Sequence, residues 1–474
     1  MDSVPITAAS RVSSVAVSSW RYRLAVPGDA RARLATRWLL LGVCALVAAG
    51  VLSILLVLAR TPRVAAHLPG VDFFRVALVA HVDLSVLVWF LAMAGVVWTL
   101  NSTPRALAVG RMAFALAGMG TLAIGLAPFI GQGRPVMANY IPVLRDPWFI
   151  AGLLMLAGSV TLAVTRAMTA VPRVGTRIDG TAALRFGINA SLVSAAVAIL
   201  AFVWSWIAVD PALDALPYFE LLFWGGGHVL QFTWTLLMLV AWLGLADAIG
   251  LAVPLSPRVV TVLFAIGLCS VFAVPVIYLA YDVGSVQHHR LLTWLMRFGG
   301  GLAIPPIAIA IVWSLARAPQ SRGDARPLRA ALASSLALFA AGGVIGFLIH
   351  GSNVRIPAHY HGCIVGVTIA LMGLAYALLP ALGFAPPEQR IATLQPYVYG
   401  TGQLLHIVGL LWSGGYGVQR KVAGSEQVLH GVQEVAGMAL MGLGGLVAIV
   451  GGLLFVVAVM RSLVRGRVSL GVRT

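Results

Sequence analysis

The stretch RIPAHYHGCIVGVTIALMGLAYALLP, residues 355 to 380, decides the fold class. It exceeds the about 20 predominantly apolar residues that an α-helix needs to cross a membrane, yet it carries two histidines, His359 and His361, near its start. Similar runs recur along the chain, which is 60% hydrophobic with a mean hydropathy of +0.95. A soluble globular protein cannot accommodate so many such runs. The sequence therefore predicts a polytopic membrane protein.

Windows of about 20 residues predict roughly twelve spans. They begin near residues 38, 75, 107, 147, 183, 219, 258, 293, 328, 358, 398 and 433. The chain shows no internal repeat and no soluble domain. We therefore expect an all-α transmembrane helical bundle of about 12 helices over residues 38–460, flanked by an Arg-rich tail at 1–37 and a short tail at 461–474.

Arginines accumulate in the N-terminal segment and in alternate loops, and this pattern predicts the orientation. These loops and the C-terminal tail hold Arg105, Arg166, Arg173, Arg177, Arg317, Arg322, Arg326, Arg329, Arg390, Arg461, Arg465 and Arg467. The positive-inside rule places this side, with both termini, in the cytoplasm. The same rule explains the formal charge of +17 better than a nucleic-acid partner does. No small-residue cleavage site precedes the first span, so the N-terminus is expected to be a tail rather than a signal peptide.

Six of the ten histidines lie at similar depth toward the outer ends of four predicted spans. They are His81, His228, His288, His289, His359 and His361. Neutral imidazole is a usual protein ligand of haem iron and copper, and an ionisable side chain inside a membrane is a functional candidate by default. We therefore predict a metal site. The other four histidines, His67, His350, His406 and His430, are expected to be interfacial or hydrogen-bonded residues.

The spacing of His359 and His361 separates their roles. Residues two apart on a helix point about 200° apart, so the two side chains cannot bind one metal and can each hold a separate haem. If His361 pairs with His81, that iron has no open position and suits electron transfer. If His359 is the only protein ligand of the other iron, one position stays open for a small gas, and His228, His288 and His289 remain for copper.

These histidines carry a family resemblance over roughly residues 38 to 460. AHVDLSVLVW, FWGGGHVLQF, QHHR and HYHG, in this order, resemble the ligand motifs of subunit I of the haem-copper oxidases, a family that includes oxygen reductases and nitric oxide reductases. The resemblance implies two haems and one copper ion. His81 and His361 would bind the low-spin haem, His359 the high-spin haem, and His228, His288 and His289 the copper. It also places Arg420 and Lys421, the latter the only lysine, near the haem propionates, although an ordinary pair of loop cations is the alternative.

The chain departs from the oxygen reductases at their tyrosine. Most of them carry a tyrosine four residues after the first copper histidine, where this chain has Phe232. One branch supplies it from the seventh span, where this chain has Tyr278 and Tyr281, although the matching position is closer to Asp282. Tyr281 and Asp282 are therefore candidate catalytic residues. Asp282 is expected to be either a buried proton donor or the partner of an arginine such as Arg290.

Two familiar proton routes from the cytoplasm are also absent from the sequence. Leu230 stands where many relatives have a glutamate, and the segment GLAIPPIAIAIVW offers no polar side chain. Nitric oxide reduction needs two electrons and two protons, needs no tyrosyl electron and can draw protons from outside. Glu220, Asp210 and Asp214 could line such an outer route, or form a solvated acidic loop. Against this, nitric oxide reductases often have a glutamate at the position of Phe232, so the balance leans only slightly to nitric oxide.

The sequence thus predicts the core subunit of a haem-copper oxidoreductase in the inner (plasma) membrane of a bacterium. Electrons would come from a cytochrome c or from a copper- or haem-bearing partner subunit, because the chain has no CxxCH haem site and no thiolate copper site. The alternative substrate is oxygen. More distant alternatives are a haem-based gas sensor, which needs no copper ligands, and a transporter, which typically has helix breaks or a repeat that this sequence lacks.

Overall fold

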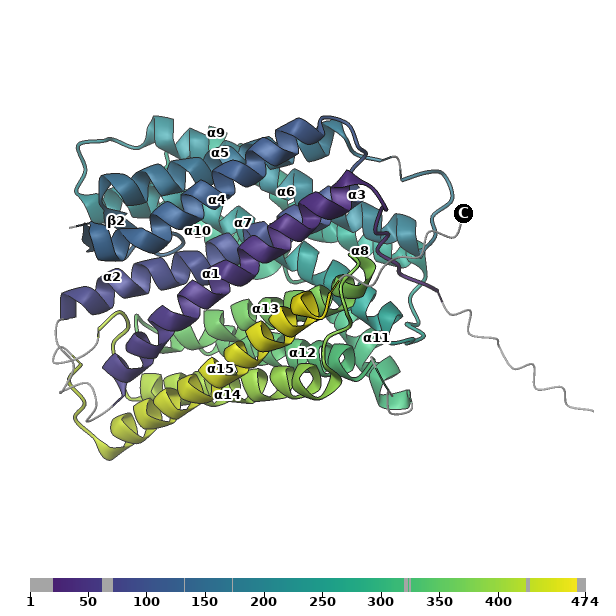
Figure 1. Cartoon of the computed structure of the whole chain (residues 1–474). Coiled ribbons are helices and arrows are strands. Elements are labelled where there is room, and N and C mark those ends of the chain that lie inside the picture. The colour runs from purple at the N-terminus through teal and green to yellow at the C-terminus, as the bar shows by residue number, and fades with distance from the viewer. Residues whose placement is uncertain are drawn as a thin grey trace, which may run out of the picture.

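The computed structural model describes residues 20–61, 71–131, 133–172, 174–318, 323, 325–422 and 427–466. Within them, twelve long helical segments run along one common direction (Figure 1). Nine are single helices: α1 (Ala30–Arg60), α4 (Leu107–Ile130), α5 (Pro147–Thr169), α6 (Gly180–Ala208), α7 (Ala215–Ala248), α12 (Ala325–Phe347), α13 (Arg355–Ala381), α14 (Gln389–Gly415) and α15 (Val432–Val464). Three are interrupted: α2 (Val71–Val82), η2 (Asp83–Val88) and α3 (Trp89–Asn101); α8 (Pro257–Cys269), η3 (Ser270–Phe272) and α9 (Ala273–Ala280); and α10 (Val286–Trp294), η4 (Leu295–Gly299) and α11 (Ile304–Arg317).

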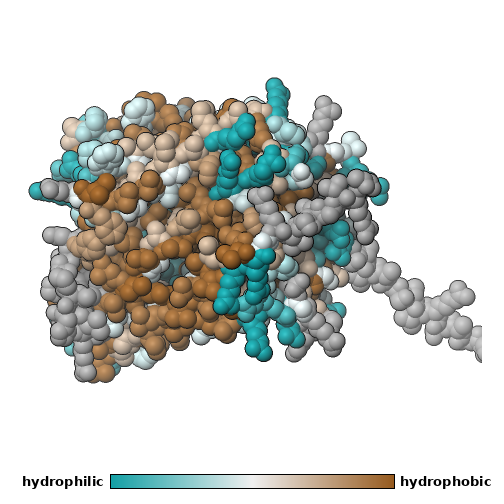
Figure 2. Space-filling model, in the orientation of Figure 1, coloured by the Kyte–Doolittle hydropathy of each residue, from teal (hydrophilic) through white to brown (hydrophobic). Residues whose placement is uncertain are grey.

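The predicted all-α membrane bundle of about 12 helices is confirmed. Eleven of the segments are long and apolar enough to cross a membrane. Figure 2 shows an apolar band around the middle of the visible face, with hydrophilic side chains gathered mainly toward its ends. The chain is therefore a multi-pass membrane protein.

The twelfth segment, α14, is less apolar because polar side chains follow one of its faces. Gln395, Tyr399, Gln403 and His406 recur at steps of four, four and three residues, which is the period of one helix face. Gln395 is fully buried and accepts a hydrogen bond from the Tyr376 hydroxyl of α13 at 3.2 Å. This polar face is therefore turned toward neighbouring helices rather than lipid.

Glycines bring α14 and α15 into backbone contact. A Cβ built on Gly402 would lie 2.4 Å from the Ala448 nitrogen, and one on Gly409 would lie 2.4 Å from the Met441 nitrogen. Small residues at such interfaces let helices in a membrane approach closely, where lipid supplies no hydrophobic driving force.

The first helix begins at Ala30, earlier than the predicted start of the first span near residue 38. Asp29 caps it by accepting a hydrogen bond from the Arg31 amide. Tyr22, further upstream, is also ordered. It is buried and donates its hydroxyl to the Leu255 carbonyl at 2.6 Å, while its amide donates to Asp247 at 3.1 Å. Burial raises the pKa of the Tyr22 hydroxyl.

Several arginines of the predicted cytoplasmic side join helix ends at one end of the bundle. Arg31 at the start of α1 donates to the Ser102 carbonyl after α3. Arg329 of α12 donates to the Leu315 carbonyl of α11 at 2.7 Å, and Arg461 of α15 pairs with Glu388 before α14 at 2.6 Å. Each of these contacts joins the ends of two helices, and the cytoplasmic orientation stays a prediction.

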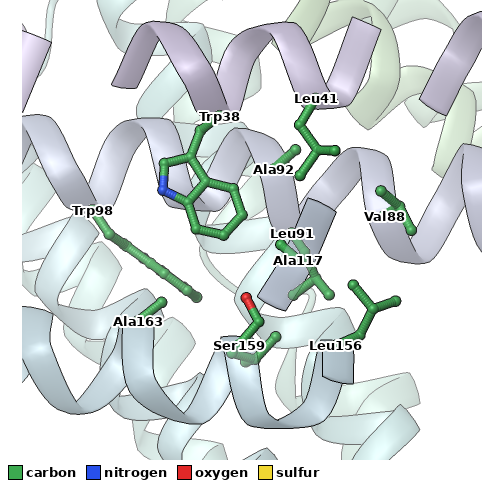
Figure 3. A pocket seen from close by; sticks show the side chains of 11 residues that line it. Trp38, Leu41, Val88, Leu91, Ala92, Trp98, Ala117, Leu156, Ser159 and Ala163 are labelled. Atoms are coloured by element: carbon green, nitrogen blue, oxygen red, sulfur yellow. The ribbon is translucent and has the colours of Figure 1, made fainter. Parts of the chain in front are cut away.

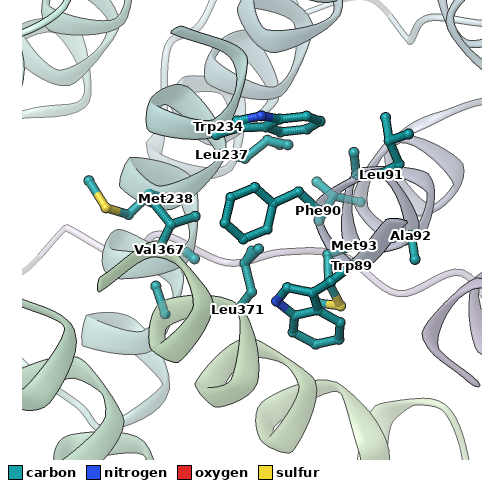
Figure 4. Close-up of a cluster of buried hydrophobic side chains, with 14 of the residues drawn as sticks. Trp89, Phe90, Leu91, Ala92, Met93, Trp234, Leu237, Met238, Val367 and Leu371 are labelled. Carbon is teal, nitrogen blue, oxygen red and sulfur yellow. The ribbon is translucent and has the colours of Figure 1, made fainter. Parts of the chain in front are cut away.

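The interrupted segment α2–η2–α3, α7 and α13 meet in the interior of the bundle (Figure 4). The Phe90 ring of α3 lies 5.5 Å, between centroids, from the Trp234 ring of α7. Leu371 of α13 borders the same cluster. These three segments carry His81, His228, His359 and His361 on the N-terminal side of this contact, so the four histidines lie toward the same end of the bundle.

A short hairpin closes that end between α4 and α5. Strands β1 (Arg134–Val136) and β2 (Val143–Arg145) pair antiparallel, with Val136 opposite Val143. The hairpin contacts α2, α5 and α7. Asp146, which follows β2, caps α5 by accepting the Trp148 amide at 2.9 Å. The residues that join the two strands are thus held over the ends of the histidine-bearing helices.

A small cavity lies between α1, α3, α4 and α5 (Figure 3). Its lining is apolar apart from Ser159, whose hydroxyl is satisfied by the Ala113 carbonyl at 2.7 Å. No candidate histidine is among the described residues that line it.

We predict that Gly409→Ala destabilises the bundle, because the added Cβ would meet the α15 backbone. Overpacking of this kind costs about 1–3 kcal/mol. Thermal unfolding of the purified protein in detergent measures the change. Gly452→Ala on α15 is the matched control, because a Cβ there meets nothing within 4 Å. Equal unfolding temperatures for the two variants would contradict the backbone contact.

Candidate metal centre

The three glycines before His228 make room for aromatic side chains against α7. Tyr278, Phe202 and Tyr140 lie against Gly225, Gly226 and Gly227 in turn, where a built Cβ would be 1.9, 2.4 and 2.2 Å from the nearest atom of each. Real Cβ atoms essentially never approach so closely. The FWGGGH segment therefore admits rings beside the histidine that a bulkier sequence would exclude.

His228 is buried and hydrogen-bonded at both ring nitrogens. Nδ1 lies 2.7 Å from the Trp224 carbonyl, and Nε2 lies 3.0 Å from the Tyr140 hydroxyl. A carbonyl can only accept, so Nδ1 carries the proton and Nε2 accepts from the tyrosine. A metal would take the place of one of these two partners.

His288 is fully buried, and neither of its ring nitrogens has a hydrogen-bond partner. Its ring packs edge-on against Tyr278, with centroids 4.6 Å apart. Its backbone amide donates to Ser285, which caps α10, at 3.2 Å. A buried imidazole without partners costs free energy, so this side chain fits a metal ion as its missing partner.

His289 and His228 both contact the ring of Trp224. The centroid of Trp224 lies 4.8 Å from that of His228 and 4.7 Å from that of His289. The His288 and His289 rings are 6.0 Å apart, and His289 Nδ1 lies 3.2 Å from the Ser285 carbonyl. Two of the three predicted copper ligands therefore share Trp224 as a neighbour, and the third, His288, contacts His289.

The three predicted copper ligands lie near one another but are not close enough to form a metal cluster. Among the residues that the structure describes, no three His, Cys, Asp or Glu side chains lie close enough to hold one ion together. Trp224 and Tyr140, which sequence reasoning did not select, contact the predicted ligands directly. Trp224 lies one turn before His228, a spacing that could have indicated it. Tyr140 is 88 residues away in sequence, and no local signal points to it.

His81 is the second-last residue of α2, and the π-helix η2 begins two residues after it. Such π segments are rare and often occur at functional sites. His81 Nδ1 lies 2.9 Å from the Ala49 carbonyl of α1. This bond fixes the proton on Nδ1 and leaves the Nε2 lone pair for a metal, as in most histidine ligands.

His359 and His361 face different helices, as their spacing predicts. His359 Nδ1 lies 2.7 Å from the Gly342 carbonyl of α12. The His361 ring contacts the His406 ring of α14, with centroids 5.0 Å apart. The two histidines therefore lie on different sides of α13, one facing α12 and the other facing α14.

The remaining histidines have local partners. His406 Nδ1 lies 3.0 Å from the Met441 carbonyl of α15, and His350 Nδ1 lies 3.1 Å from the Leu348 carbonyl at an exposed site. The His430 amide donates to Glu434 at 2.6 Å. His67 lies outside the described residues.

The basic pair lies over the hairpin. Lys421 donates to the Met137 carbonyl and, at 3.2 Å, to the Asn139 side chain, which Arg420 also contacts at 3.3 Å. Asn139 in turn donates to Glu220 at 2.8 Å. Burial and the neighbouring Arg420 lower the pKa of Lys421. A contact of this pair with haem propionates stays a prediction.

Tyr281 and Asp282 lie on the turn between α9 and α10. Tyr281 follows the end of α9 and is 41% exposed, and Asp282 is also exposed. The premise that Asp282 is buried is therefore not met, because the helix ends before it. Of Tyr278 and Tyr281, it is Tyr278 that contacts a candidate ligand, and this residue is 5% exposed and still within α9.

Comparison with known proteins identifies relatives and the fold. The protein RP382 of Rickettsia prowazekii (strain Madrid E), described as uncharacterised, is 30% identical over 494 residues, covering 89% of this chain and 94% of that protein. An uncharacterised protein of Aquifex aeolicus (strain VF5) is 25% identical over 362 residues, covering 76% and 88%. No protein-family model matches the chain.

A solved structure described as a haem-copper terminal oxidase dimer superposes with a TM-score of 0.70. The alignment covers 93% of this chain and 85% of that one at 15% sequence identity, which shows the fold. The chain therefore belongs to the same family as the Rickettsia prowazekii protein, and it has the fold of subunit I of the haem-copper oxidases.

Proposed function

We propose that this chain is the core subunit of a membrane-bound haem-copper oxidoreductase that reduces a diatomic gas. The observation that carries the proposal is the buried His288, whose two ring nitrogens lack hydrogen-bond partners. The other two predicted copper ligands, His228 and His289, both contact the ring of Trp224. The order of the six histidines and the fold support the same conclusion. We place its N- and C-termini in the cytoplasm of a bacterium.

The metal groups would be held by six imidazoles. His81 and His361 would bind the low-spin haem, His359 the high-spin haem, and His228, His288 and His289 the copper. When bound, these groups supply electron transfer and the reduction of the gas. The chain orients His81 through Ala49 and His359 through Gly342, and the Trp224 ring packs against His289.

Nitric oxide is the preferred substrate. Two molecules of nitric oxide take up two electrons and two protons to give nitrous oxide and water. The position one turn after His228 is the buried Phe232, which can neither donate a proton nor be oxidised readily. Glu220 lies on the outer side and is hydrogen-bonded to Asn139, so protons could be supplied from there. Asp210 and Asp214 stay candidates for the same outer route.

Oxygen is the second candidate, and Tyr278 favours it. Its ring contacts His288, and its hydroxyl is bonded to Ser205 at 2.8 Å and donates to the Ala201 carbonyl at 3.2 Å. A tyrosine so placed could supply an electron and a proton for oxygen cleavage. In both cases the electron donor would be a cytochrome c or a metal-bearing partner subunit on the outer side.

We expect the purified protein to contain two haems per copper ion. Optical spectra of the pyridine adduct and metal analysis give this ratio. Absence of haem would contradict the proposal and favour a transporter. Haem without copper would contradict the copper site and favour a gas sensor.

Turnover with nitric oxide is expected to exceed turnover with oxygen when a reduced artificial donor is used. Tyr278→Phe should leave nitric oxide turnover within about threefold of wild type, because loss of a tyrosine proton donor matters for oxygen and not for this reaction. Gas-electrode rates on the same preparation measure both. Rapid oxygen reduction abolished by Tyr278→Phe or Tyr281→Phe would contradict the nitric oxide assignment.

A further inference from the structure

The residues that join β1 to β2 are held firmly over the candidate copper ligands. Val136 and Val143, which pair across the hairpin, are both buried. Lys421 contacts the Met137 carbonyl, and Asn139 is bonded to Glu220 of α7 at 2.8 Å. The segment is therefore tied to the α14–α15 connection on one side and to α7 on the other.

Tyr140 projects from this segment onto α7. Its ring fills the space beside Gly227, where a Cβ would lie 2.2 Å from the tyrosine Cγ. The ring centroid is 4.8 Å from that of His228 and 6.0 Å from that of Trp224. The hydroxyl is 3.0 Å from His228 Nε2. Glycine at 227 and tyrosine at 140 are thus complementary in shape.

We propose that Tyr140 is a positioning residue of the copper site, holding His228 through the hydrogen bond between its hydroxyl and Nε2. This inference rests on the proposed function. Copper bound to His228 would take the place of the Trp224 carbonyl at Nδ1, and Nε2–H would then donate to the Tyr140 hydroxyl, which can accept as well as donate. Partners of this kind fix the ring orientation of histidine ligands.

The Tyr140 side chain is hydrogen-bonded to two residues of α7, His228 and Gln231. One turn after His228 the helix offers Phe232, which packs toward η4, where a Cβ on Gly300 would lie 3.3 Å from its ring. The polar partner observed for Nε2 is Tyr140, which comes from another element. The hairpin provides it from the outer side, next to the cluster of Asn139, Glu220 and Lys421.

Tyr140→Phe tests the bond because it keeps the ring and removes only the hydroxyl. We expect the variant to bind copper with about 10- to 100-fold lower affinity than wild type. After dialysis against a copper chelator, it should therefore retain less copper per haem. We also expect an altered electron paramagnetic resonance spectrum of the oxidised copper. Haem content and thermal unfolding should match wild type. Tyr416→Phe is the matched control, an exposed tyrosine on the same side.

Gly227→Ala tests the same contact from the other partner, since the added Cβ would displace the Tyr140 ring. We expect it to reproduce the copper loss of Tyr140→Phe. If Tyr140→Phe keeps wild-type copper affinity and spectrum, the ring matters only for packing and the inference is overturned. If the wild-type protein itself binds no copper, the proposed function fails first, so the two failures are distinguishable.

Discussion

A hydrogen bond from a histidine Nδ1–H to a backbone carbonyl underlies the arrangement of this bundle. It recurs at His81, His228, His289, His359 and His406. At three of them the carbonyl belongs to a neighbouring helix, α1, α12 or α15. An unsatisfied buried donor costs about 1–3 kcal/mol, so each bond ties the orientation of a ring to the packing of a helix pair. At His81 and His359 this bond leaves Nε2 for a metal, whereas Nε2 of His228 is bonded to Tyr140.

Close helix packing makes these bonds reachable. A Cβ on Gly342 would lie 2.5 Å from the Cys363 nitrogen, and one on Gly346 would lie 2.8 Å from His359 Nδ1. Glycines on α12 therefore let α13 approach until His359 meets the Gly342 carbonyl. Glycines have the same effect in the FWGGGH segment, where they allow aromatic side chains, rather than the backbone of another helix, to pack against α7. Glycines of these helices thus determine how the candidate histidine ligands are oriented, although glycine is common in membrane helices.

The sequence was sufficient for the helices, because they depend on local period and hydropathy, and the six histidine ligands stay a prediction. It could not place the start of α1, since the capping by Asp29 outweighs the weaker hydropathy of residues 30 to 37. Nor could it locate η2, which depends on packing around His81. Tyr281 was selected over Tyr278 because the end of α9 at Ala280 is not evident from composition. Tyr140 was missed because only a hairpin contact brings it to His228.

We propose that imidazoles from α7 and α10 bind one copper ion. Extended X-ray absorption fine structure at the copper edge of the purified holoprotein tests it most directly, because imidazole rings give a characteristic multiple-scattering pattern. The account predicts three imidazole nitrogens around copper and no sulfur. A shell dominated by sulfur, or one with a single imidazole, would contradict it.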